Sequence, residues 1–392
     1  MNVPDDLSSA KALKFVVLLG LVSLLADATY ESARSISGPF LALLGASGAI
    51  VGLVAGFGEL IGYGLRLASG YIAEKTGKYW GITIFGYAVN LLAVPALALA
   101  GSWEIAASLL VLERVGKAIR TPARDVMLSH ATSRMGRGWG FGLHEAMDQI
   151  GAVLGPVIVA VILYYKNGYH AAFGWLLVPA LLTLSVLVAA RFLYPRPRDF
   201  EFNIPALERK GFPRSYWIYL IAVCLVAAGF ADFPLIAFHL KKTSAASDSS
   251  IPVLYAIAMG VDALAALIFG RLFDRKGLPV LAAAFLASAF FAPLAFGRTF
   301  PFAIAGMALW GIGMGAQESI MRAAIANMVP PDKRGSAYGI FNATFGIVWF
   351  LGSALMGLLY DISLPALIFF SVIVQLCAVP LLLRLRNEGR SG

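Results

Sequence analysis

The sequence contains few charged residues and almost no cysteine. Only 14% of its 392 residues are Asp, Glu, Lys or Arg, and 59% are hydrophobic. In soluble domains, about a quarter of the residues are charged. Both cysteines, Cys224 and Cys377, lie in apolar runs. Neither a framework of disulfides nor a paired-cysteine metal or redox site is therefore predicted. This composition indicates an integral membrane protein.

Motifs of nucleotide hydrolysis and of membrane enzymes are also missing. The chain has no GxxxxGK(S/T) loop, no GxSxG and no HExxH, so we expect neither an ATPase nor another enzyme, and no cofactor. The acidic start, with Asp5 and Asp6, and the lack of a small-residue cleavage site argue against a signal peptide. The net charge of +9 is interpreted as Lys and Arg kept on the cytoplasmic side, not as a sign of nucleic-acid binding.

Long apolar runs recur along the whole chain. A membrane-spanning helix needs about 20 mostly apolar residues. Twelve windows of this kind have approximate centres at Leu25, Leu60, Val89, Val115, Leu154, Leu182, Val226, Ala263, Leu286, Ile312, Ile347 and Ile373. The sequence therefore predicts an all-α integral membrane protein with twelve transmembrane helices.

The breaks between these runs alternate between a basic kind and a kind with little charge. The positive-inside rule places the basic loops and both termini in the cytoplasm, and we expect the plasma (inner) membrane of a bacterium. The longest polar stretch predicts a linker at residues 191–215 between an N-terminal six-helix bundle, 1–190, and a C-terminal one, 216–392.

The two halves resemble each other internally. GYIAEKTGK, starting at Gly70, matches GRLFDRKGL, starting at Gly270, a shift of 200 residues. GWGFGLHEAM, starting at Gly138, matches GSAYGIFNAT, starting at Gly335, a shift of 197. Two segments with nearly one offset indicate a duplicated, pseudo-symmetric six-helix unit. Such repeats place a substrate site at their interface, near the bilayer midplane, and support alternating access.

Three motifs resemble those of the major facilitator superfamily. Gly70, Glu74 and Lys78 fit the G-x-x-x-D-R/K-x-G-R/K loop after the second helix, with Glu in place of Asp. Gly270, Asp274 and Arg275 repeat the loop after the eighth helix, and the run from Glu113 to Asp125 resembles the Arg-containing motif of the fourth. Gly151, Gly155 and Pro156 are similar to the fifth-helix G-x-x-x-G-P motif of drug:proton antiporters. The resemblance implies the major facilitator fold. We predict a gating role for these residues, with plain helix packing as the alternative for the fifth-helix glycines.

Ionisable residues lie inside the predicted spans, where burying a charge costs on the order of 3 kcal/mol or more. Asp27 and Glu31 are one helical turn apart, as are His144 and Asp148. A carboxylate hydrated from either side in turn could carry a proton. We predict proton coupling by Asp27, Glu31, Glu145 and Asp148, and substrate binding by Tyr30, Arg34, Glu59, Glu113, Arg114, Lys117, His144, Asp232, Phe341 and Trp349. A static ion-pair network is the alternative for these charges.

Other charges are predicted nearer the cytoplasmic ends of the helices. Arg66, Arg120, Arg124 and Arg322 could reach the interface by extending their side chains or could form salt bridges, in either case without a transport role. Asp125 belongs to the same group. For the basic loops we expect a lock between helices formed by Glu74 with Lys75 and Lys78, repeated around Asp274.

These patterns favour a secondary carrier, expected as a monomer in the lipid bilayer with protons and a small molecule as partners. Proton-coupled export of amphipathic or drug-like molecules is the first interpretation. Transport of a polar or anionic metabolite is the alternative, because basic residues lie near mid-depth. Transport of a transition-metal ion is a weaker alternative, with candidate ligands His144, Met147, Asp148, Met127 and His130. These ligands are too few to predict a resident metal site. A receptor or scaffold that transports nothing is the competing class.

Overall fold

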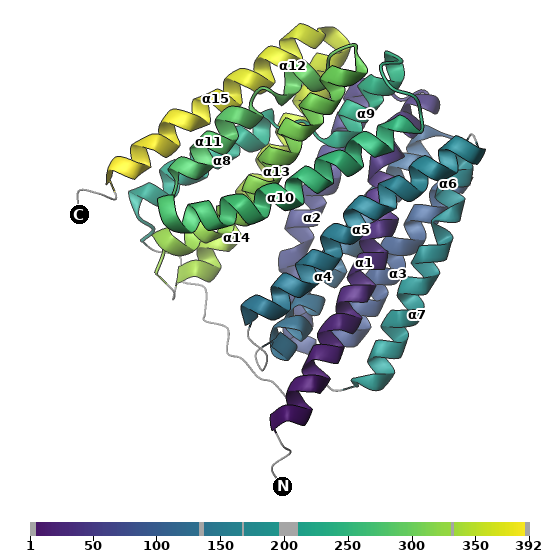
Figure 1. Cartoon of the computed structure of the whole chain (residues 1–392), viewed down its shortest axis with the longest axis vertical. Coiled ribbons are helices and arrows are strands. Elements are labelled where there is room, and N and C mark those ends of the chain that lie inside the picture. The colour runs from purple at the N-terminus through teal and green to yellow at the C-terminus, as the bar shows by residue number, and fades with distance from the viewer. Residues whose placement is uncertain (1–4, 133–136, 167, 196–210, 331–332, 389–392) are drawn as a thin grey trace. The chain divides into compact units, whose positions relative to one another are not determined.

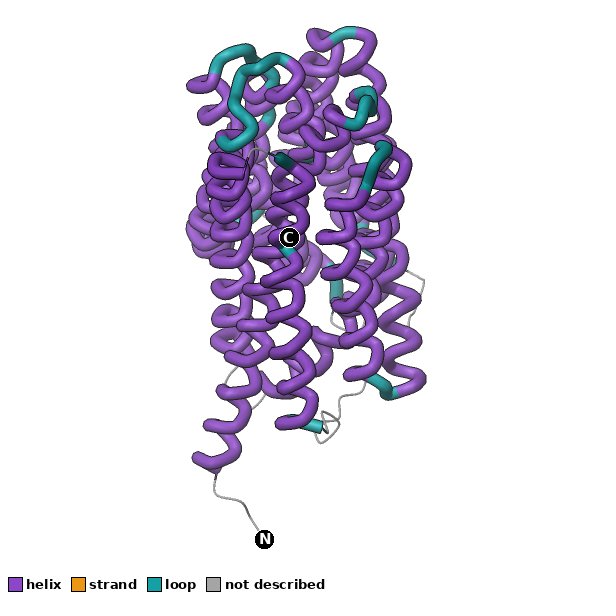
Figure 2. Tube along the Cα trace, turned by 90° about the vertical axis from the view of Figure 1, so that its right-hand side faces the viewer, coloured by secondary structure: helices purple, strands orange, loops and turns teal. Residues whose placement is uncertain are grey.

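A computed structural model describes residues 5–132, 137–166, 168–195, 211–330 and 333–388 of the chain. Every regular element in these ranges is helical (Figure 1). The elements are α1 (Asp5–Leu43), α2 (Gly48–Thr76), α3 (Tyr79–Ala96), the 3-10 turn η1 (Leu97–Leu99), α4 (Trp103–Thr132), α5 (Arg137–Lys166), α6 (Tyr169–Trp175), α7 (Leu177–Leu193), α8 (Arg214–Gly229), α9 (Phe233–Lys242), α10 (Ser250–Lys276), α11 (Pro279–Ser288), α12 (Phe291–Ala295), α13 (Phe300–Met328), α14 (Arg334–Ile362) and α15 (Leu364–Glu388). Figure 2 shows short loops between the helices.

The described residues contain ten stretches that are long and apolar enough to cross a membrane. Two further segments complete the predicted pattern. The first is α4, whose charges set it apart from the apolar helices. The second is the shorter apolar segment Pro279–Ala295, which comprises α11 and α12. Each predicted centre falls within one of these segments, so the twelve-helix, all-α membrane fold is confirmed.

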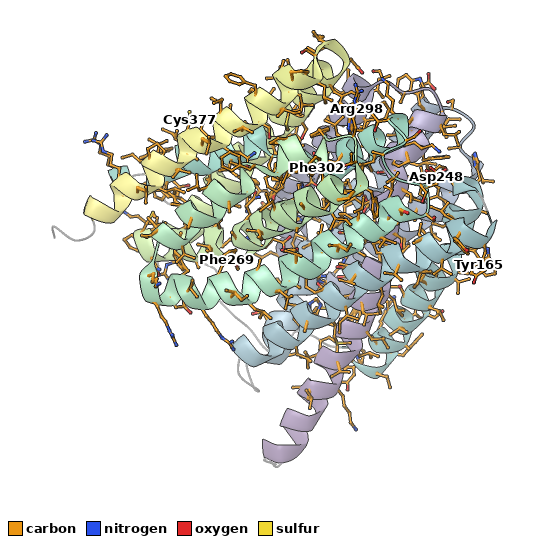
Figure 3. All side chains as sticks on the ribbon, turned by 45° about the horizontal axis from the view of Figure 1, so that its top comes forward. Tyr165, Asp248, Phe269, Arg298, Phe302 and Cys377 are labelled. Atoms are coloured by element: carbon orange, nitrogen blue, oxygen red, sulfur yellow. The ribbon has the colours of Figure 1, made fainter. Side chains whose placement is uncertain are left out.

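Large apolar side chains are exposed along the outward faces of these helices. Tyr165 on α5 and Phe302 on α13 are examples (Figure 3). Cys377 on α15 is exposed in the same way, and Cys224 on α8 is half-buried. A soluble protein rarely leaves so much apolar surface in water. In a membrane the same side chains face lipid, which carries no penalty for apolar exposure.

One membrane-length segment is interrupted in its middle. α8 ends at Gly229 and α9 begins at Phe233, with Pro234 in the first turn of α9. Proline has no N–H to donate and so favours the start of a helix. The interruption leaves backbone carbonyls without helical partners, and side chains of other helices satisfy them. Trp310 Nε1 donates to the carbonyl oxygen of Ala231 at 2.9 Å, and Ser371 Oγ donates to that of Gly229 at 2.6 Å.

The backbone contacts divide the chain into two compact units. The first contains residues 1–34 and 61–204, and the second contains residues 35–60 and 205–392. The division passes through α1 and α2, so the hairpin between these helices belongs to the second unit. The predicted bundles at 1–190 and 216–392, with a linker at 191–215, stay a prediction, and 196–210 lie outside the described residues.

Glycines bring helices together within each unit. In the first unit, Gly116 of α4 lies against the backbone of Asn90 on α3, at a place where a Cβ would collide with it. In the second unit, Gly311 and Gly315 of α13 lie in the same way against the backbone of α10. Helices that touch at small residues approach closely enough for main-chain packing. In the first unit, such packing sets the faces that the charged helices turn toward one another.

Candidate functional site

Charged side chains from three helices gather in the first unit. α1 contributes Asp27 and Glu31, each only 7% exposed. α4 contributes Lys117 and Arg120, and α5 contributes Asp148. The charges of Asp27, Asp148, Lys117 and Arg120 lie close enough to interact. The acids predicted from sequence on two separate spans therefore meet at one place.

The glycine motif of α5 is what brings the two acids together. Gly151 lies against the backbone of Leu24 on α1, and a Cβ built on it would be only 3.0 Å from the Cβ of Asp27. One turn later, Gly155 lies against Ala28. Asp148 is three residues before Gly151, so it shares the face that contacts α1. The predicted gating residues Gly151 and Gly155 are thus packing positions in this conformation, and Pro156 follows within the same helix.

His144 lies one turn before Asp148 on α5. Its Nδ1 is 3.5 Å from Oδ2 of Asp148, and the imidazole is buried. This spacing holds the two groups on one face of the helix. Glu145 is exposed, although its charge acts on Asp148. Of the acids predicted on this helix, Asp148 is therefore the more enclosed, with 17% of its side chain exposed.

Lys117 joins the α1 acids to an aromatic ring. Its Nζ is 3.9 Å from Oε1 of Glu31 and 3.8 Å from the ring centroid of Tyr30. A cation over a ring face is stabilised by the ring quadrupole, more strongly when water is excluded. Tyr30 is itself buried. The predicted substrate-binding residues Tyr30 and Lys117 therefore lie in contact.

Glu113 and Arg114 pair with each other next to Lys117 on α4. Asn90 of α3 donates from Nδ2 to Oε1 of Glu113 at 2.7 Å and to its carbonyl oxygen at 3.0 Å. Arg114 Nε lies 3.3 Å from Oε2 of Glu113. Asn90 and Glu113 are buried. This arrangement ties α3 to α4 at the level of the charged cluster.

Arg124 forms a salt bridge of the predicted kind, with Asp125, whereas Arg120 is enclosed and does not extend to the membrane interface. Arg120 is only 1% exposed, with its guanidinium carbon 4.2 Å from the ring centroid of Tyr87 and 5.6 Å from that of Tyr30. Arg124 donates to Ser23 Oγ at 2.9 Å and to Asp125 Oδ1 at 2.8 Å. Both arginines therefore belong to the site, because the face of α4 that carries them turns toward α1 and α3.

Other predicted residues are half-buried or exposed. Arg34 and Glu59 are half-buried. In the predicted loop motifs, the charged side chains of Glu74, Lys78, Asp274 and Arg275 are exposed, and within the described residues Glu74 forms no ion pair. Gly70 faces Pro122 of α4, and Gly270 faces Ser319 of α13. The lock predicted for these loops stays a prediction.

The second unit holds a different kind of polar centre. Asp232, at the interruption between α8 and α9, is 2% exposed and accepts hydrogen bonds from Trp349 Nε1 at 3.0 Å and Ser353 Oγ at 2.7 Å. Phe230 packs against Trp310 and Trp349. Phe341 stacks on Phe345 with centroids 5.4 Å apart. These rings are buried against one another and form part of the core of the second unit.

Sequence reasoning missed several members of the site. Ser23, Tyr87 and Asn90 are polar residues in apolar runs, and a polar residue in a span was the available signal. Met127 is buried, and the side chain of His130 lies outside the described residues. Among the residues searched, no three His, Cys, Asp or Glu side chains gather as a metal would require.

The profile of the Major Facilitator Superfamily matches residues 19–316 and 218–392. The chain is a member of this superfamily. A relative from Mycobacterium tuberculosis, named as an uncharacterized protein, is 40% identical to this major facilitator protein over 382 residues, covering 96% of this chain and 93% of its own. Multidrug resistance protein MdtH of Aeromonas hydrophila is 23% identical over 341 residues, covering 83% of this chain and 82% of its own.

Solved structures support the same architecture for this major facilitator protein. A crystal structure of a peptide transporter POT superimposes with a TM-score of 0.79 over 100% of this chain and 99% of that one, at 13% identity. A crystal structure of the nucleoside transporter NupG gives a TM-score of 0.76 over 94% of this chain. At such identities the likeness shows the fold. The protein is therefore a multi-pass membrane transporter of the major facilitator kind.

Proposed function

We propose that this major facilitator protein is a proton-coupled exporter of small amphipathic or drug-like molecules. The observation that carries the proposal is the meeting of the buried Asp27 on α1 with the half-buried Asp148 on α5, beside Lys117 and Arg120. Two carboxylates that share a low-dielectric site disfavour simultaneous ionisation. A proton held there compensates the repulsion, and an adjacent cation offsets the charge when the proton leaves.

Alternating access couples this proton to a substrate. The proposed carrier acts as an antiporter in the inner membrane of a bacterium, as a monomer with both termini in the cytoplasm and two pseudo-symmetric bundles that rock about a central site. When the site opens to the outside of the cell, the acids contact external water and take up a proton. When it opens to the cytoplasm, they release the proton. Only a protonated or a substrate-loaded form changes conformation, so the pH gradient drives export.

The likeness to MdtH supports the choice of substrate class. That relative is named as a multidrug resistance protein, and the α5 glycine motif that fits drug:proton antiporters here holds α1 and α5 in contact. An amphipathic molecule suits a site in which Tyr30 and Tyr87 lie beside charged groups. Such sites combine apolar walls with a few polar groups that fix orientation.

The proton-coupling proposal is tested by flux through reconstituted protein. Ethidium, chloramphenicol and benzoate serve as a cationic, a neutral and an anionic probe in liposomes with an imposed pH gradient. For any probe that the wild type moves, we expect Asp148→Asn to reduce gradient-driven flux to the level of empty liposomes. The amide keeps the shape of the side chain but exchanges no proton.

Asp248→Asn is the matched control for this experiment. Asp248 lies on the loop between α9 and α10 and pairs with Lys241 at 2.6 Å, away from the α1–α5 acids in the sequence. We expect this variant to transport as the wild type does. Wild-type flux in folded Asp148→Asn would remove Asp148 from the coupling mechanism.

A second candidate function is proton-coupled transport of a polar or anionic metabolite. The observation that favours it is the convergence of Lys117, Arg120 and Arg124 on one side of the acids. In the flux experiment, gradient-driven movement of benzoate without movement of ethidium or chloramphenicol would restrict the transported molecules to anions.

A further inference from the structure

Arg120 is the most completely enclosed charged side chain of the site. It extends from the middle of α4, and only 1% of its surface is exposed. A guanidinium stays ionised at any physiological pH. Its burial is therefore costly unless its donors find acceptors.

The neighbours of Arg120 include aromatic rings, which leave some of its N–H groups without hydrogen-bond acceptors. The rings of Tyr87 and Tyr30 lie 4.2 and 5.6 Å from its guanidinium carbon. Ring faces attract the cation, but they do not replace the in-plane hydrogen bonds of its N–H groups. Within the described residues, no acceptor reaches Nε or Nη1 of Arg120. Native proteins leave few buried donors in this condition.

The other cations of α4 already have acceptors. Arg114 lies against Glu113, Lys117 against Glu31, and Arg124 against Asp125 and Ser23. Asp27 is near enough for its charge to act on Arg120, yet Oδ1 of Asp27 also has no hydrogen-bond partner among the described residues. In the described part of the chain, Arg120 is thus a buried cation that no contacting carboxylate neutralises.

We propose that Arg120 anchors a single carboxylate group of the transported molecule. A carboxylate would supply one of these two groups, Nε or Nη1, with an acceptor through a charge-assisted hydrogen bond. A doubly charged group such as phosphate fits less well, because Asp27, Glu31 and Asp148 lie nearby and would repel it. The flanking rings of Tyr30 and Tyr87 favour a planar or aromatic body next to the carboxylate.

This assignment rests on the proposed function only in taking the bound molecule to be the transported one. It narrows the substrate class from amphipathic molecules in general to amphipathic monocarboxylates. Binding at Arg120 needs no pH gradient. It can therefore hold or fail independently of proton coupling by Asp148.

Three probes of nearly one shape test the assignment with the purified full-length protein. Benzoate is an anion, benzamide is neutral and benzylammonium is a cation. Their affinities are read from the rise in unfolding temperature with probe concentration at constant ionic strength. We expect benzoate alone to stabilise the wild type. We expect Arg120→Gln to weaken benzoate binding by about tenfold to a hundredfold, the range for loss of hydrogen bonds to a charged group.

Arg191→Gln is the control, because Arg191 is an exposed arginine near the end of α7. It should bind benzoate as the wild type does. Equal stabilisation by benzamide, or unchanged benzoate affinity in Arg120→Gln, would overturn the assignment. So would the absence of any benzoate effect on the wild type.

A second measurement covers the case in which Arg120→Gln does not fold. Phenylglyoxal modifies arginine side chains, and mass spectrometry of the wild type reports each site. Benzoate should slow the modification of Arg120 and leave that of Arg191 unchanged. Equal rates at Arg120 with and without benzoate would contradict the proposal. Loss of flux in Asp148→Asn with retained benzoate binding would separate the coupling site from the anchor.

Discussion

At the scale of single residues, buried polar groups divide into those that are satisfied and those that are not. Asp232 is satisfied, since Trp349 and Ser353 both donate to it. Asp27 and Arg120 each keep atoms without a partner among the described residues. Satisfied groups hold a fold together, whereas incompletely satisfied ones are where a proton or a ligand can bind. This contrast separates Asp232 from the charged cluster of the first unit.

Asp232 provides a prediction at this scale. Asp232→Leu leaves the indole N–H of Trp349 and the hydroxyl of Ser353 buried without their acceptor. We expect the free energy of unfolding to fall by about 1–3 kcal/mol per stranded donor. Thermal unfolding of the purified variant measures the change, with Asp248→Leu on the exposed loop as control. An unfolding temperature equal to that of the wild type would mean that the two hydrogen bonds contribute nothing to stability.

At the scale of helices, close contacts at glycine decide which side chains can meet. Gly151 packs on α1, whereas Gly142, earlier on the same helix, has open space where a Cβ would lie. The two positions share a helix and a residue type but differ in what surrounds them. They therefore form a matched pair for testing whether α1–α5 packing carries the function.

We expect Gly151→Ala to lower both stability and transport, because the new methyl group collides with the backbone of Leu24 and pushes α1 from α5. Gly142→Ala should be neutral or stabilising by up to about 1 kcal/mol, since alanine is the better helix former. Flux assays and thermal unfolding of both variants make the comparison. Equal behaviour of the pair would show that α1 and α5 tolerate separation.

A second contact between helices lies in the second unit, at the start of α2. Oδ1 of Asp361 accepts from the N–H of Gly48 at 3.0 Å, and Oδ2 accepts from that of Ala49 at 2.8 Å. The end of α14 thus caps the exposed N–H groups that begin α2. Gly52 also packs on Gly357 of α14 with no room for a side chain.

Removing this cap should loosen the hairpin between α1 and α2. Loss of a capping carboxylate costs about 0.5–2 kcal/mol, so we expect Asp361→Ala to speed amide hydrogen exchange at residues 44–52. Exchange in α8 and α15 should stay as in the wild type. Unchanged exchange at the hairpin would show that glycine packing alone holds it against α14.

At the scale of the whole molecule, the apolar helices place the chain in the membrane. The basic loops determine the predicted orientation of the chain across the membrane. Ser247 precedes α10 and Lys276 ends it. The 27 residues of this helix span about 40 Å at 1.5 Å per residue, enough to cross the hydrocarbon core. The two positions therefore face opposite sides of the membrane.

Labelling from outside the cell tests the predicted orientation. In a chain with Cys224 and Cys377 changed to Ala, a membrane-impermeant maleimide should react with Ser247→Cys in intact cells. It should react with Lys276→Cys only after the membrane is opened, because the basic loop is predicted to be cytoplasmic. The reverse pattern would invert the topology.

The sequence by itself determined the number of membrane segments, their approximate centres and the superfamily. These properties are local: a run of apolar residues needs no partner to be recognised, and the motifs are contiguous. The charges inside the spans, among them Asp27, Glu31 and Asp148, were also visible, because an ion in an apolar run is anomalous wherever it occurs.

Only the tertiary structure decided which of those residues meet. The rotation of α4 turned Arg120 away from the interface and between Tyr30 and Tyr87. Contact at Gly151 put Asp27 beside Asp148, while Glu145 on the same helix faced outward. A helix rotates by about 100° per residue, so a shift of one position changes the neighbours of every side chain. Packing against other helices sets that rotation, so the sequence of a single segment does not determine it.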